Sequence, residues 1–128
     1  MPVRVVRLGS PREAGEGLRI GTVRRPPRGV PKEEFARRDY YDVWLPALSP
    51  SADLVKEAQG AQSESAWNAF RRKYRHEMSQ TDASHLLDLL AALSHRTDFS
   101  VGCYCEVEAH CHRSVLKELL VEHGARVA

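Results

Sequence analysis

Residues 99–120 read Phe-Ser-Val-Gly-Cys-Tyr-Cys-Glu-Val-Glu-Ala-His-Cys-His-Arg-Ser-Val-Leu-Lys-Glu-Leu-Leu. Residues 99–105 are apolar or small and predict a buried β-strand. Residues 114–123 place Val115, Leu116, Leu119 and Leu120 on one face, which predicts an amphipathic helix that ends before Gly124. A strand that leads directly into a helix is the unit from which parallel sheets are built.

The remaining elements are predicted from short periodic segments. Residues 3–8 and 18–23 are rich in β-branched and aliphatic side chains and predict strands, and 125–128 predicts a last edge strand. A short helix is predicted over 32–38, and a second from a Ser49 cap and Pro50 to about residue 59. A third helix is predicted along the apolar stripe Trp67, Phe70, Tyr74 and Met78. A fourth is predicted over 85–94, after a cap at Thr81 or Asp82. We therefore expect one small α/β domain over residues 1–128, with a mostly parallel sheet flanked by helices.

The composition limits the class of protein. No apolar run approaches the ~18–20 residues that a membrane helix needs, and Met1-Pro-Val-Arg-Val-Val-Arg7 is too short and too basic for a signal peptide. We therefore expect a cytoplasmic protein with no membrane contact, in which the three cysteines stay reduced. Residues 1–45 carry ten Lys or Arg against six Asp or Glu, which falls short of a nucleic-acid-binding stripe.

All three cysteines lie within nine residues, Cys103, Cys105 and Cys111, followed by His112 and Arg113. We expect this run at the carboxyl end of the buried strand and in the first turn of the last helix. The N–H groups of a helix N-terminus attract anions and lower the pKa of a thiol. Ligands of open α/β sheets bind at the carboxyl ends of the strands. The run therefore predicts a functional site.

The leading hypothesis is an anion-binding, cysteine-dependent site, with catalysis on a small anionic substrate. Cys111 or Cys105 would supply the thiolate, His112 the base and Glu106 an acid or orienting group. The anion would be held by three arginines, Arg113 with Arg24 and Arg28. The spacing excludes a phosphatase loop, because Arg113 is eight residues after Cys105 and two after Cys111.

Two other hypotheses stay open. In the first, Cys103, Cys105, Cys111 and one of His110 or His112 hold a zinc ion in a binding or regulatory module. In the second, Cys103 simply packs in the core, because free cysteine is among the most buried residue types. A weak nucleic-acid-binding accessory is the least favoured function.

Several short motifs resemble a known family. In chain order they are Gly17-Leu-Arg-Ile20, Arg24-x-x-Pro27-Arg28-Gly29, Trp44-Leu-Pro-Ala-Leu-Ser-Pro-Ser51, Trp67-x-x-Phe70-x-x-x-Tyr74-x-x-Glu77 and Cys111-His-Arg-Ser114. Over roughly residues 3–124, this order resembles domain-of-unknown-function family 488, which includes the YeaO-like proteins. The resemblance implies a small bacterial or archaeal α/β domain without an agreed activity. Many YeaO-like members have an acidic residue and a tryptophan where this chain has Val23 and Pro26, and they lack the Cys-His-Arg run.

Overall fold

Four parallel strands form one sheet, with β4 and β2 at its centre and β1 and β3 at its edges. The strands are β1 (Val3–Arg7), β2 (Leu18–Gly21), β3 (Val43–Trp44) and β4 (Phe99–Cys103). The computed structural model describes residues 2–105 and 111–128. Because these strands run in the same direction, their carboxyl ends meet at one edge of the sheet. The predicted α/β class with a parallel sheet is confirmed.

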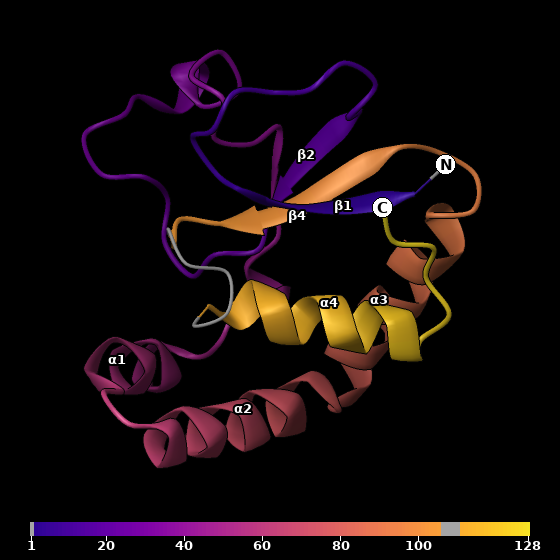
Figure 1. Cartoon of the computed structure of the whole chain (residues 1–128). Coiled ribbons are helices and arrows are strands. Elements are labelled where there is room, and N and C mark those ends of the chain that lie inside the picture. The colour runs from indigo at the N-terminus through magenta and orange to yellow at the C-terminus, as the bar shows by residue number, and fades with distance from the viewer. Residues whose placement is uncertain (1, 106–110) are drawn as a thin grey trace.

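The helices are α1 (Ala52–Gly60), α2 (Glu64–Met78), α3 (Thr81–Leu93) and α4 (His112–Glu122). Figure 1 shows all four on the same side of the sheet, with α4 nearest to β1 and β4 and with α1 and α2 further away. The apolar face of α4 is buried, as its periodicity predicts, and Gly124 follows the helix with a φ of 93°. This packing fixes the start of α4 near the carboxyl end of β4.

The aromatic stripe of α2 is core rather than a surface for stacking ligands. Trp67, Phe70, Tyr74 and Met78 are all buried, as predicted. The hydroxyl of Ser63 caps the helix by accepting a hydrogen bond from the Ala66 N–H at 3.1 Å. The Tyr74 hydroxyl donates to the Leu48 carbonyl at 2.7 Å, so α2 also holds the segment that precedes α1.

Gly102 allows β4 to lie close to β1. A Cβ at this position would lie 2.5 Å from the carbonyl oxygen of Val6 and 2.9 Å from Cδ2 of Leu8. No other residue type leaves this space free. The glycine in the Ser-Val-Gly-Cys run is therefore a packing requirement directly beside Cys103.

Arg19 is buried on the face of the sheet opposite the helices. Its neighbour Ile20 belongs to the main core, and alternate residues of a strand face opposite sides. The guanidinium forms a bidentate pair with Glu16, at 3.0 and 2.8 Å, and donates to the carbonyls of Ser10 and Asp39. The buried charge is thus fully paired, as burial requires.

Several predicted boundaries were wrong. β4 ends at Cys103 rather than Cys105, and Val43–Trp44 forms the edge strand β3, which was not predicted. Only a 3-10 turn over Lys32–Glu34 stands in the segment predicted as a helix over 32–38, and the segment 125–128 contributes a single bridge between Val127 and Val3. Ser51, not Ser49, caps α1, and Gln80 rather than Thr81 precedes α3.

Over the described ranges, no helix is both long and apolar enough to cross a membrane.

Candidate functional site

Three donor atoms converge where β4 ends and α4 begins. Cys103 is the last residue of β4, Cys111 is the N-cap of α4, and His112 is the first residue of that helix. Their sulfur and ring nitrogen atoms lie within 4.8 Å of one another. The side chains of Cys103 and Cys111 are only 2% and 1% exposed. The junction of β4 and α4 therefore brings two sulfurs and an imidazole together.

His112 is held in one orientation and one tautomer. Its Nε2 atom lies 2.7 Å from the carbonyl oxygen of Thr22. Because a carbonyl can only accept, Nε2 carries the proton and donates it, and the neutral ring keeps its lone pair on Nδ1. That Nδ1 atom lies 3.9 Å from the sulfur of Cys111, and the ring packs edge-on against Tyr74. The lone pair therefore faces the cysteines.

The environment of His112 favours its neutral form. Desolvation lowers the pKa of His112, the nearby charge of Arg113 lowers it further, and the hydrogen bond to Thr22 raises it, with the result that the pKa is about 4. The imidazole is therefore uncharged at neutral pH. A neutral imidazole is the form that binds a metal ion.

The sulfurs of Cys103 and Cys111 are joined as a disulfide. This differs from the expectation of three reduced thiols. The two Cα atoms are 7.8 Å apart, beyond the about 4.4–6.8 Å that ordinary disulfides span. Burial of Cys103 agrees with its predicted place in the core, where it packs in a small cluster with Leu8, Val23 and Tyr41.

Cys105 is the free cysteine and lies outside this cluster of donors. Its side chain is exposed, and it follows β4 by two residues. Partial desolvation raises the pKa of its thiol, although the charge of Arg113 and a backbone hydrogen bond act in the opposite direction. The structure thus separates Cys105 from the two buried cysteines, a distinction that sequence spacing does not make.

The predicted arginines occupy different environments. Arg113 follows His112 in α4 and is 5% exposed, so its charge is buried beside the cluster. Arg24 donates instead to the carbonyls of Pro50 and Ser49, at 3.0 and 3.4 Å, and Arg28 is exposed. Glu106 and His110 lie outside the described residues.

Sequence reasoning missed Thr22 and Tyr41. Thr22 follows β2, the strand beside β4. The group that contacts His112 is the backbone carbonyl of Thr22, so the residue type gives no signal in the sequence. Tyr41 is 4% exposed and packs in the cluster that contains Cys103 and Cys111, yet its hydroxyl oxygen has no hydrogen-bond partner. Gly21 makes room for the Tyr41 ring, since an added Cβ would lie 2.4 Å from Cδ2 of that ring.

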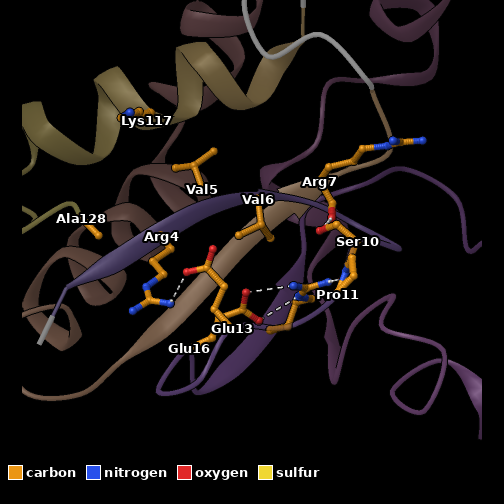
Figure 2. A pocket seen from close by; sticks show the side chains of 11 residues that line it. Arg4, Val5, Val6, Arg7, Ser10, Pro11, Glu13, Glu16, Lys117 and Ala128 are labelled. Atoms are coloured by element: carbon orange, nitrogen blue, oxygen red, sulfur yellow. Dashed lines mark hydrogen bonds and ion pairs between the residues drawn. The ribbon is translucent and has the colours of Figure 1, made fainter.

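A separate cavity of about 500 Å³ lies along β1, away from this cluster. Figure 2 shows that Arg4 reaches Glu13 across this cavity and that Glu16 turns inward to its own arginine partner. The carboxylates of Glu13 and Glu16 at this cavity are therefore already paired with arginines. The residues around this cavity include none of the cysteine and histidine donors that the structure describes.

The fold and the cluster together define a small α/β protein with a Cys/His centre at the carboxyl edge of a parallel sheet. Residues 3–124 match the family model described as the active DUF488-N3 subclade, and the chain belongs to that family. The resemblance to family 488 is thereby confirmed. Neither the curated proteins nor the solved structures contain a match to this chain.

Proposed function

We propose that the chain is a metal-binding protein in which reduced Cys103 and Cys111, together with His112, hold a zinc ion. The observation that carries this proposal is the convergence of the two sulfurs and a ring nitrogen of His112 within 4.8 Å, at a histidine whose Nε2 is already hydrogen-bonded. Two thiolates and an imidazole are a frequent zinc ligand set. A carbonyl that accepts a hydrogen bond from the other ring nitrogen, and so fixes the ring, is the usual support for a metal-binding histidine.

The separation between Cys111 and His112 is close to that of two ligands of one ion. Ligands held tetrahedrally at about 2.0–2.3 Å from zinc lie about 3.3–3.8 Å from each other. The separation of 3.9 Å between Cys111 Sγ and His112 Nδ1 is close to this range. The Cα separation of 7.8 Å is wide for a disulfide, so reduction frees two sulfurs on a backbone already open enough for an ion.

We propose that the ion takes part in a reaction and does not only stabilise the fold. The family is described as an active subclade, which supports a reacting centre rather than a purely structural one. Zinc polarises bound oxygen atoms and lowers the pKa of bound water to about 7. Cys103 and Cys111 would act as ligands, and Arg113 would make the surroundings favourable for an anionic substrate.

The test is zinc binding by the reduced protein. Wild type treated anaerobically with a phosphine reductant is titrated with zinc against a competing chelator. We expect one ion per chain and a melting temperature that rises on the order of 10 °C at a zinc concentration about 100-fold above Kd. Cys103→Ser and Cys111→Ser abolish tight binding, whereas the matched control Cys105→Ser retains it. Reduced wild type that binds no zinc contradicts the proposal.

The second candidate is a cysteine nucleophile, favoured by the exposure of Cys105 and the nearby charge of Arg113. It would use Cys105 or Cys111 as thiolate, His112 as base and a small anionic substrate. The raised pKa of Cys105 and the engaged Nε2 of His112 make it the weaker of the two proposals. Iodoacetamide discriminates between them: rapid alkylation of one thiol at neutral pH in the zinc-free protein favours the nucleophile.

A further inference from the structure

Zinc in proteins is almost always four-coordinate, and the three converging donors leave one position to be filled. The sequence pattern offers Cys105 as a fourth ligand, and His110, which lies outside the described residues. In the structure Cys105 is exposed, while Cys103 and Cys111 are buried. Within the described parts of the chain, the group of neighbouring donors consists of Cys103, Cys111 and His112, with Cys105 outside it.

Tyr41 supplies a buried polar group in the cluster that contains Cys103 and Cys111. Its side chain is 4% exposed, it packs in one cluster with Cys103 and Cys111, and its hydroxyl oxygen is buried without a hydrogen-bond partner. A buried hydroxyl without a partner is costly, so such a group is available to donate to a bound water or ligand. The neighbouring Tyr40 differs, because it is only partly buried and packs at the margin of the same cluster.

The start of α4 provides positive electrostatic potential on the same side. Cys111 occupies the N-cap, but its side chain caps none of the N–H groups of the first turn. These N–H groups, the helix dipole and the buried guanidinium of Arg113 all favour an anion. A helix N-terminus alone would not define a site, but here its first residues, Cys111 and His112, are two of the three donors, and Tyr41 with its unpaired hydroxyl packs in the same cluster as Cys111.

We propose that the fourth position of the metal stays open and binds water or a small oxyanion, with the Tyr41 hydroxyl and the first-turn N–H groups of α4 as hydrogen-bond donors. This inference rests on the metal site proposed above and adds the class of its exchangeable ligand. Tyr41 is the residue that distinguishes an exchangeable position from a closed structural site.

The experiment uses cobalt(II) in place of zinc, because its visible spectrum reports the ligands of the metal. Reduced full-length protein is loaded with cobalt(II) and titrated with inorganic phosphate, and the same titration is repeated with azide. We expect a saturable change in the visible bands. Tyr41→Phe should bind one cobalt per chain with unchanged affinity, yet bind the anion about 3- to 10-fold more weakly.

Two controls separate this inference from the proposal on which it rests. Tyr40→Phe removes a hydroxyl from the neighbouring position and should leave anion binding unchanged. Cys105→Ser should alter neither the thiolate-to-cobalt absorption nor the response to anions. Cobalt that binds but does not respond to either anion, or a lost thiolate contribution in Cys105→Ser, overturns the open position while leaving the metal site intact. Failure to bind cobalt at all overturns both.

Discussion

The Nε2–H of His112 donates to the carbonyl oxygen of Thr22 across 2.7 Å, and this contact joins the first turn of α4 to the end of β2. This contact determines which ring nitrogen of His112 is available to a ligand. With Nε2 engaged, Nδ1 is the atom that meets the sulfur of Cys111. The proposed metal site therefore depends on a backbone group that no side-chain substitution removes.

His112→Gln should separate binding of the metal from folding. The glutamine amide can reach the position of Nε2 and still donate to Thr22, but it has no lone pair at the position of Nδ1. We expect near-native stability of the metal-free protein. Zinc affinity should fall by more than the about 10- to 100-fold that is lost when a group supporting a ligand is removed. Calorimetric zinc titration of the reduced variant measures this, and unchanged affinity would exclude His112 as a ligand.

Gly102→Ala should destabilise the protein because the added methyl group meets backbone. The Cβ would lie 2.5 Å from the Val6 carbonyl oxygen, so β1 and β4 must move apart. We expect a loss of about 1–3 kcal/mol in the free energy of unfolding, measured in urea. Gly60→Ala is the control, since nothing lies within 4 Å of a Cβ at the end of α1. Equal stability of the two variants would refute this account of the packing.

Glu16→Gln tests the buried ion pair. It leaves Arg19 buried without a carboxylate partner, and removal of one partner from such a pair costs about 3–5 kcal/mol. Glu13→Gln is matched in chemistry, but Glu13 is exposed and pairs with Arg4 at the surface. That control should change the free energy of unfolding by less than about 0.5 kcal/mol. Similar losses in both variants would show that burial does not set the difference.

Asp42 should contribute stability that disappears in acid. Desolvation raises the pKa of Asp42, but the hydrogen bonds from Arg12 and from the Arg19 N–H lower it more, so the net shift is downward. A carboxyl group with a lower pKa in the folded state stabilises the protein above its unfolded pKa of about 3.9. This contribution is lost as the pH falls through the folded pKa.

Asp42→Asn should therefore be less stable than wild type by about 1–2 kcal/mol at neutral pH. The difference should shrink as the pH falls below about 4. Urea unfolding of both proteins across this pH range is the measurement. A difference that is independent of pH would mean that the charge of Asp42 contributes nothing.

The sequence predicts the centre of the fold well because its signals there are local. The apolar run before Cys103 and the periodicity of residues 115–120 identify β4 and α4, and their succession places Cys111 at a helix start. The two-residue strand β3 was missed, because Val43 and Trp44 are both exposed and show no alternation.

The partners within the site could not be predicted from the sequence because they are distant along the chain. His112 and Thr22 are separated by 90 residues, and only the strand order brings them together. Arg24 was expected at the anion site, but its donors reach the carbonyls of Ser49 and Pro50. The orphan hydroxyl of Tyr41 likewise depends on tertiary packing.

The most direct test of the central claim is X-ray absorption at the zinc edge of the reduced, zinc-loaded protein. The proposed metal site predicts two sulfur neighbours at about 2.3 Å and two nitrogen or oxygen neighbours at about 2.0 Å. The nitrogen is assigned to His112 and the sulfurs to Cys103 and Cys111. A shell with no sulfur, or one that keeps both sulfurs in Cys103→Ser, would contradict the account.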